Sequence, residues 1–251
     1  MTDAPAPMQP KHVRIADQIR TAIDSGGLQP GERLEAEDVL AAEYKTSAAT
    51  INRAVELLKV EGYLEGRRGS GVYRQELPSL QFPVLPGEMG GHWGGGGIWE
   101  TDDAQSLDID RVTVDEVKPP QRVARVLRLE AGADKVVRLA ARFSVEGRPV
   151  RYVRTFLPRR LLTDAQRAKL NQAVSNDMVV TLRNLDQHPA AIQVEARSQM
   201  PTGEDVDLLS IPVGRFVLRL YRTAYDDRGP IGVEETMLDT ASYVLKYGYT
   251  V

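Results

Sequence analysis

The most constraining feature of the sequence is a set of three short apolar stripes with helical spacing, crowded into its first quarter and joined by short connectors. Apolar residues three and four positions apart are typical of helices that bury one face. The stripes consist of Val13, Ile15, Ala16, Ile19, Ala22 and Ile23, of Ala36, Val39, Leu40 and Ala42, and of Ile51, Ala54, Val55 and Leu58. Gly26 ends the first stripe, and Ser47 and Gly62 are suited to begin and end the third. The sequence therefore predicts three helices, of which the first covers residues 12–26 and the second residues 35–43.

A small hairpin is expected directly after the third helix. Two strand-like segments, at 63–65 and 71–74, flank a basic, glycine-rich turn at 66–70. Two helices joined by a short turn and followed by such a hairpin form the outline of a winged helix-turn-helix. In that outline the third helix is the recognition helix.

The composition changes after the hairpin, which indicates a second domain. Residues 76–108 contain three prolines and a run of four glycines at 94–97, and we interpret this segment as a linker and loop. Further on, alternating patterns predict strands at 111–117, 135–145, 149–156 and 216–225, and helical stretches at 122–127, 163–173, 179–184 and 203–209. We predict an α+β chain with a winged helix-turn-helix at 1–75 and a mixed α/β domain with an antiparallel sheet at 109–251.

Several functional classes are excluded or disfavoured by composition. The absence of cysteine excludes disulfides, thiolate metal sites and a cysteine nucleophile. The three histidines, His12, His92 and His188, are far apart, and we expect no metal and no cofactor. The sequence has no run of 18 apolar residues and no signal-peptide pattern, so a cytoplasmic protein without membrane contact is expected.

Particular residues in both halves resemble a known family. In the first half these are Gly27-Leu28-Gln29-Pro30-Gly31-Glu32-Arg33-Leu34, Leu40-Ala41, Thr46-Ser47, Thr50-Ile51, Glu61-Gly62-Tyr63 and Arg68-Gly69-Ser70-Gly71. In the second half they are the segments 124–127, 147–150, 156–158, 207–214 and 222–235, together with Arg142. The first set resembles the DNA-binding domain of GntR-type transcription regulators, and the second resembles the UTRA effector-binding domain of their HutC-like branch.

The resemblance implies a homodimeric repressor that binds a pseudo-palindromic operator in double-stranded DNA and is released by a small-molecule effector. It also implies a second domain with the fold of chorismate lyase. Two alternatives stay open: a regulator without an effector, for example of plasmid transfer, whose second domain only dimerises, and a chorismate-lyase-like enzyme. Because no nucleophile and base stand at a motif-like spacing and because fold does not carry function, we do not expect an enzyme.

The expected DNA-binding surface is local, because the net charge of −3 gives no overall attraction to nucleic acid. Residues 44–74 hold six basic and three acidic side chains, which concentrates positive charge on the third helix and the hairpin. We expect contacts from Lys45, Ser47, Ala48, Thr50, Asn52 and Arg53, and from Arg67, Arg68, Gly69 and Ser70 in the wing. Solvated surface residues are the alternative interpretation.

The sequence departs from the family pattern in this region. Ala48 and Asn52 replace two family arginines, which removes two expected phosphate contacts. Glu37 adds a carboxylate that would repel phosphate unless it points away.

The expected effector site combines cations, backbone donors and aromatic rings. An anionic effector needs a fixed cation and N–H donors, which Arg138 or Arg142 and the glycines Gly95 and Gly96 would supply. Glu235 would receive hydroxyls or an amine, and Trp93 and Tyr152 would form an apolar wall. In the alternative interpretation Arg142 and Glu235 pair with each other or face water, and the aromatic residues belong to the core.

Overall fold

The computed structural model describes residues 9–76, 80–83, 107–130, 135–174 and 178–246. Its contacts divide the chain into two compact units, Met1–Leu77 with Pro212–Arg215, and Pro78–Ile211 with Phe216–Val251. We call the first unit the head and the second the sheet domain. Within the described residues, no helix combines the length and the apolar character that a bilayer crossing requires.

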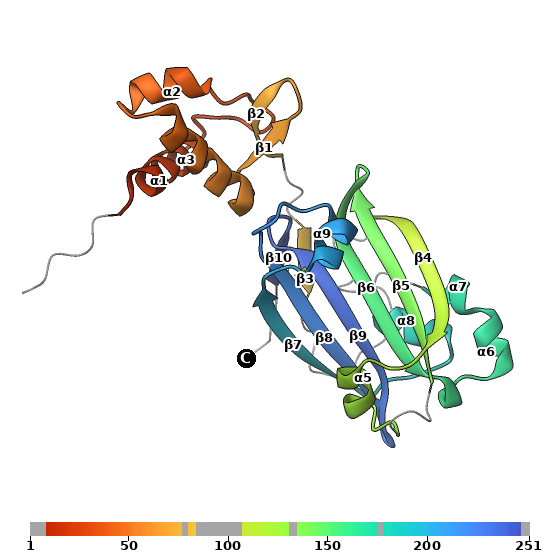
Figure 1. Ribbon diagram of the computed structural model, residues 1–251. Helices are drawn as coiled ribbons and strands as arrows, with labels where there is room; N and C mark the ends of the chain where they lie inside the picture. The colour runs from red at the N-terminus through yellow and green to blue at the C-terminus, as the bar shows by residue number, and fades with distance from the viewer. Residues whose placement is uncertain (1–8, 77–79, 84–106, 131–134, 175–177, 247–251) are drawn as a thin grey trace, which may run out of the picture. The chain divides into compact units, whose positions relative to one another are not determined.

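The head is a winged helix-turn-helix, as predicted. Its elements are α1 (Lys11–Asp24), α2 (Glu37–Glu43), α3 (Ala48–Glu61), β1 (Leu64–Arg67) and β2 (Gly71–Arg74) (Figure 1). The two strands form an antiparallel hairpin, and Arg33 adds an isolated bridge to Tyr73. Helix α2 begins two residues later than expected, with Ala36 in an extended conformation before it.

The ends of α3 form as the sequence indicates. The Ser47 side chain accepts a hydrogen bond from the backbone N–H of Thr50 at 3.3 Å, and Gly62 adopts a left-handed φ of 90°. The buried face of α3 packs with α1 and α2 in one apolar cluster, to which Ile51, Ala54, Val55, Leu58, Ile15, Ile19 and Leu40 belong. Val39 was expected in this core, but it is 48% exposed because α2 turns it outward.

The sheet domain is built on six antiparallel strands in the order β4-β5-β6-β9-β8-β7, which confirms the predicted α+β class (Figure 1). The strands are β4 (Asp108–Val117), β5 (Val136–Val145), β6 (Arg148–Pro158), β7 (Ala191–Gln199), β8 (Val217–Asp226) and β9 (Gly229–Asp239). The helices are α5 (Gln121–Val126), α6 (Asp164–Ala168), α7 (Leu170–Ala173), α8 (Met178–Asn184) and α9 (Gly203–Leu209), with a 3₁₀ turn, η1, at Arg159–Leu161.

One expectation about the linker is wrong. Within 76–108 lies a strand, β3 (Leu80–Pro83), which pairs in parallel with β10 (Tyr243–Lys246) at the end of the domain. The physical reason is that Leu80 is buried in an apolar cluster with Tyr243. Such a pairing joins segments more than 160 residues apart, so local composition does not reveal it.

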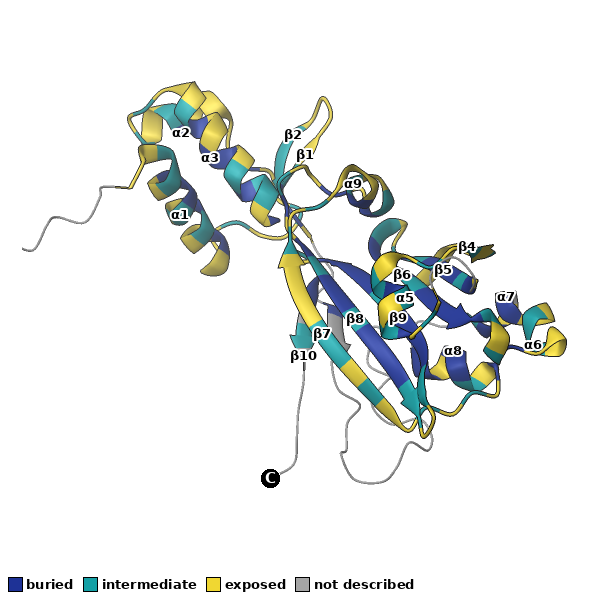
Figure 2. Cartoon of the chain, turned by 60° about the horizontal axis from the view of Figure 1, so that its bottom comes forward, coloured by how far each residue is buried: buried dark blue, intermediate teal, exposed yellow. Residues whose placement is uncertain are grey.

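Side chains alternate between the two faces of the six-stranded sheet. On one face Val137, Leu139 and Leu157 pack against Leu170 of α7 and Met178 of α8, and we call this the helix-covered face. On the other, two separate helices cover opposite ends: α5 packs on Val136, Phe156 and Val233, and α9 packs on Val217 and Met237. We call this second face the charged face, because polar side chains lie between α5 and α9. Figure 2 shows β8 largely buried and the edge strand β7 largely exposed or half-buried.

Candidate functional site

Helix α3 presents one exposed face opposite its buried stripe. Ala49, Asn52, Arg53 and Glu56 follow one another at helical spacing and are all exposed. Thr50 lies beside this face and is half-buried, with its hydroxyl 3.0 Å from the Ser47 hydroxyl. Thr50 therefore takes part in the cap of α3, and Asn52 and Arg53 are the hydrogen-bond donors on the exposed face.

The cations of the head differ in how far their charge is already compensated. In the described part of the chain, Arg53 of α3 and Arg68 of the wing make no ion pair or side-chain hydrogen bond. Arg67, by contrast, lies 2.8 Å from Glu65 and stacks over the ring of Tyr73 at 4.4 Å. Arg53 and Arg68 are thus the better placed to bind phosphate.

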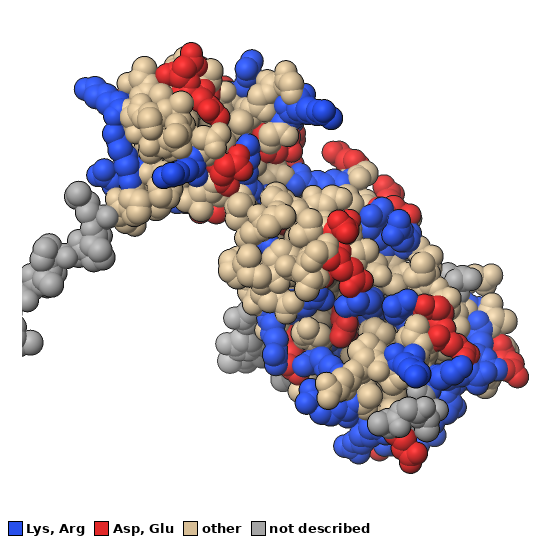
Figure 3. Space-filling model, viewed as in Figure 1, with Lys and Arg blue, Asp and Glu red and all other residues tan. Residues whose placement is uncertain are grey.

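Several residues next to these cations have a left-handed backbone, which at the glycines of the wing lets another molecule approach the main chain closely. At the wing tip Gly69 and Gly71 adopt φ values of 73° and 120°, and the Ser70 hydroxyl contacts the Tyr73 hydroxyl. In the turn before α3, Lys45 is exposed with a φ of 48°, and its carbonyl accepts a hydrogen bond from Lys11 Nζ at 2.6 Å. Ala48 begins α3 and is exposed. Figure 3 shows acidic side chains interspersed with the basic ones on the visible side of the head.

The carboxylate of Glu37 meets α3 directly. Asn52 Nδ2 donates a hydrogen bond to Glu37 Oε1 at 3.1 Å, and both residues are exposed. The two residues are 15 positions apart, so the sequence raised the question of Glu37 but did not reveal its partner.

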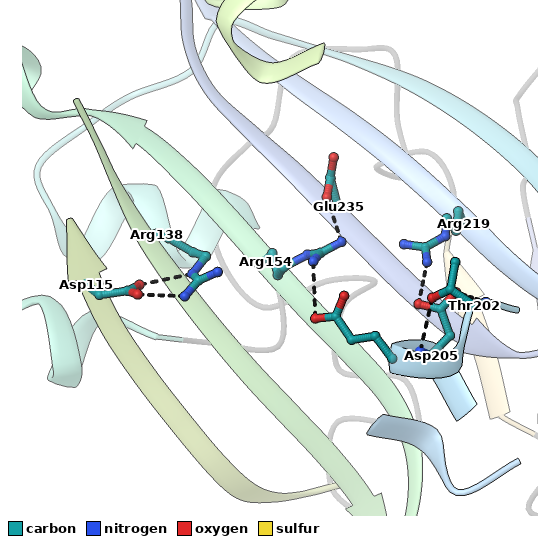
Figure 4. A network of polar contacts seen from close by, with 8 residues as sticks. Asp115, Arg138, Arg154, Thr202, Asp205, Arg219 and Glu235 are labelled. Atoms are coloured by element: carbon teal, nitrogen blue, oxygen red, sulfur yellow. Dashed lines mark hydrogen bonds and ion pairs between the residues drawn. The ribbon is translucent and has the colours of Figure 1, made fainter. Parts of the chain in front are cut away.

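On the charged face, three of the expected effector residues lie on neighbouring strands. Tyr152 is on β6, and Figure 4 shows Arg138 on β5 and Glu235 on β9. Arg154, two positions after Tyr152 on the same face, was not among the expected residues. Arg154 lies 3.1 Å from Glu235 and 3.8 Å from Glu204 of α9, so one guanidinium serves two carboxylates.

Two further ion pairs flank Arg154 (Figure 4). Arg138 binds both carboxylate oxygens of Asp115 on β4, at 3.0 and 2.6 Å, and these hydrogen bonds raise the pKa of Arg138. Arg219 of β8 lies 2.5 Å from Asp205, whose side chain also accepts from the Thr202 backbone N–H that precedes α9. Burial by itself raises the pKa of Asp205, but the bonds from Arg219 and Thr202 outweigh it and the net pKa is lowered. The Arg219–Asp205 pair therefore fastens α9 to the sheet.

Arg142 is held elsewhere on β5. It lies 2.7 Å from Asp110, which also accepts a hydrogen bond from Ser144, and these bonds outweigh burial and lower the pKa of Asp110. The alternative in which Arg142 pairs with Glu235 is wrong, because each has a partner on an adjacent strand. Tyr152 packs with the α9 cluster, and burial raises the pKa of its hydroxyl.

The remaining expectations have different outcomes. Trp93, Gly95 and Gly96 lie outside the described residues. Among the residues that are described, no cluster of three or more His, Asp or Glu side chains is arranged to hold a metal ion. Arg138, Arg142, Arg154 and Arg219 all carry carboxylate partners. An anion at any of these four guanidinium groups would therefore compete with a carboxylate that is already bound there.

Arg154 would have been accessible to sequence reasoning, because it follows Tyr152 by two positions on a predicted strand. Glu204 and Asp205 carried no such signal. Their place beside β6 and β8 depends on how α9 folds back over the sheet.

Comparison with protein-family models identifies both parts of the chain. A model described as "UTRA domain" matches residues 107–243, and one described as "Bacterial regulatory proteins, gntR family" matches residues 11–73. The first covers more than half of the chain.

Individual relatives agree with these matches. An HTH-type transcriptional regulator of Streptomyces coelicolor is 27% identical over 235 aligned positions, and the match covers 87% of this chain and 84% of the relative. The repressor of the mannosyl-D-glycerate transport/metabolism system of Escherichia coli is 38% identical over 68 residues, and the match spans 27% of this chain and 28% of that repressor.

Solved structures support the fold. A GntR-family regulator structure superimposes with a TM-score of 0.62 at 21% identity, covering 97% of this chain and 98% of the other. PhnF from Mycobacterium smegmatis gives a TM-score of 0.53 at 18% identity, covering 94% and 99%. The chain therefore belongs to the gntR family of bacterial regulatory proteins, among the members that carry a UTRA domain.

Proposed function

We propose that this regulator is a sequence-specific DNA-binding repressor of the HutC-like branch, which acts in the cytoplasm as a homodimer without catalysing a reaction. The observation that carries the proposal is the exposed face of α3, where Asn52 and the uncompensated Arg53 stand side by side. Arg68 at the wing tip supplies a second uncompensated charge. The Escherichia coli relative whose head is similar is named as a repressor, which supports the direction of regulation.

The test is a fluorescence-anisotropy titration of the full chain on the DNA upstream of its own gene and on a scrambled duplex, at two salt concentrations. Tight binding to the native duplex that survives competitor DNA is the expected result. Equal and strongly salt-dependent binding to both duplexes would show that the chain binds this upstream DNA without sequence specificity. That result would contradict the proposal that an operator lies in this DNA.

Replacing Arg53 by Ala is expected to weaken binding to all duplexes alike. It should flatten the dependence of log Kobs on log salt by about 1 per bound head, because one phosphate contact is lost. Lys59→Ala is the matched control on the same helix, since Lys59 already pairs with Glu56 at 2.7 Å. A changed base preference with an unchanged salt slope would show that the contact of Arg53 is to a base.

We also propose that the charged face of the sheet domain binds a small-molecule effector that releases the repressor. The proposal rests on Arg154, whose partners Glu235 and Glu204 belong to different elements, β9 and α9. A ligand that offers both an acceptor to the guanidinium and donors to the carboxylates would insert into this arrangement and move α9. Such a ligand shifts the population of DNA-binding conformations only if it binds the two states unequally.

Arg154→Met is expected to abolish effector-dependent release while leaving operator affinity in the absence of effector unchanged. The measurement titrates candidate metabolites, polyols and zwitterions included, into the anisotropy complex of the original chain and of the variant. Arg159→Met is the control, because Arg159 pairs with Glu116 on the surface, with 42% of its side chain exposed. Release of the variant at the same ligand concentration would place the effector site elsewhere, and no release by any ligand would favour a second domain that only dimerises.

A further inference from the structure

The contact between Glu37 and Asn52 restricts what α3 can read in DNA. Asn52 lies on the exposed face of α3, and Glu37 approaches it from the first turn of α2. Within the described residues, neither side chain makes another hydrogen bond or ion pair. In the described structure the two side chains therefore have each other as hydrogen-bond partners, and because both are exposed a ligand can reach them.

The chemistry of the pair fixes the orientation of the Asn52 amide. An ionised carboxylate only accepts hydrogen bonds, so the group of Asn52 that faces Glu37 must be its NH₂ and not its carbonyl oxygen. One of the two N–H groups is used in this bond. The other N–H and the carbonyl oxygen remain, and they cannot exchange places while Glu37 is present.

One donor and one acceptor on a single amide match adenine in the major groove. Adenine presents the N7 acceptor beside the N6 amino donor, and asparagine binds this edge with two hydrogen bonds. Guanine presents two acceptors, N7 and O6, so its O6 would face the carbonyl oxygen of Asn52 with no hydrogen-bond donor between them. The pair thus favours adenine and disfavours guanine.

We propose that Asn52 reads an adenine in each operator half-site and that Glu37 is a positioning residue that holds the amide in the adenine-binding orientation. This proposal rests on the proposed function, since it requires that α3 enters the major groove. It also assigns a role to Asn52, one of the two positions where a family arginine is replaced.

A neighbouring carboxylate provides the matched control. Asp38 is exposed in the same first turn of α2, and in the described structure it makes no hydrogen bond with Asn52. Glu37→Gln and Asp38→Asn each remove one negative charge from the first turn of α2. Both should raise affinity for all duplexes, but only Glu37→Gln should change base preference, because glutamine both donates and accepts and so lets the amide turn over.

The experiment selects duplexes from a randomised library with the full chain and identifies the position whose base preference changes in Asn52→Ala. At that position adenine is then replaced by 7-deazaadenine, which lacks N7, or by unsubstituted purine, which lacks the N6 amino group. Each replacement is expected to weaken binding of the original chain by roughly 5- to 150-fold. Asn52→Ala should be insensitive to both, and Glu37→Gln should accept guanine more readily than the original chain does.

The results separate the two proposals. If no duplex is enriched, the proposed function fails together with this inference. If duplexes are enriched but Asn52→Ala leaves every position unchanged, or the position is not adenine, the reading by Asn52 is wrong while the proposed function stands. If Glu37→Gln keeps the base preference of the original chain, or if Asp38→Asn changes it as much as Glu37→Gln does, the positioning role of Glu37 is refuted. Circular dichroism of each variant verifies that the head remains folded.

Discussion

Replacing Glu234 by Gln is expected to lower the free energy of unfolding of the sheet domain by about 3–5 kcal/mol. Glu234 of β9 lies opposite Arg222 of β8, with Arg222 Nη2 2.7 Å and Nε 2.9 Å from Glu234 Oε1. Both side chains are only 3% exposed. Removal of the negative charge takes a buried, doubly hydrogen-bonded carboxylate away from the guanidinium of Arg222, and in this low-dielectric interior water cannot replace that carboxylate.

Two further variants make this expectation specific to a buried pair. Glu116→Gln removes the same charge from a surface pair with Arg159, whose side chains are 42% and 39% exposed, and its effect should be about 0–1 kcal/mol. The double variant Arg222→Met with Glu234→Leu should be far closer to the original stability than Glu234→Gln, because it removes both charges. Urea unfolding followed by circular dichroism measures all three. An effect of Glu234→Gln as small as that of Glu116→Gln would contradict the argument.

The head could be predicted from the sequence because its signals are local. The cap at Ser47, the left-handed glycine at 62 and the apolar stripe between them lie within one helix, and each has a direct physical effect on that helix. Arg53 follows from the same reasoning, since the residues that are not buried on α3 form its outer face. Val39 shows the limit, because a helix of seven residues gives too short a stripe to fix which side is buried.

For the sheet domain the sequence predicted the α+β class, but it did not predict the strand order or the ion pairs. Strand β7 was not predicted, although Ile192 and Val194 alternate along it with the polar Gln193 and Glu195, as in a strand with one exposed face. The partners of Arg154 are 50 and 81 residues away, brought close by the packing of α9 and the register of β6 with β9. Residues of opposite charge are frequent in this chain, and no spacing rule tells which of them will face each other.

Replacing Leu58 by Ala is expected to destabilise the head by about 2–5 kcal/mol. Leu58 of α3 is fully buried, in the cluster that also holds Ile15 and Ile19 of α1. Truncation to Ala leaves a cavity, and the packed helices around it cannot move enough to fill it. For a domain of this size such a loss lowers the thermal midpoint by at least about 8 °C. Calorimetry of the full chain is the measurement, with the transition of the sheet domain as an internal reference.

DNA binding by Leu58→Ala shows whether the variant changes the DNA-contacting surface of the head or only the stability of the head. Below the lowered thermal midpoint of the head, Leu58→Ala should still select the same DNA sequences as the original chain, because no DNA-facing side chain has changed. Above that midpoint, DNA binding should disappear while the sheet domain stays folded. Val39→Ala removes a side chain of similar chemistry that is 48% exposed, and it should change stability by no more than about 0.5 kcal/mol. If both variants lowered the midpoint equally, the burial of Leu58 would not be what stabilises α3. In that case the packing of α3 against α1 would not explain what holds the exposed face of the recognition helix in position.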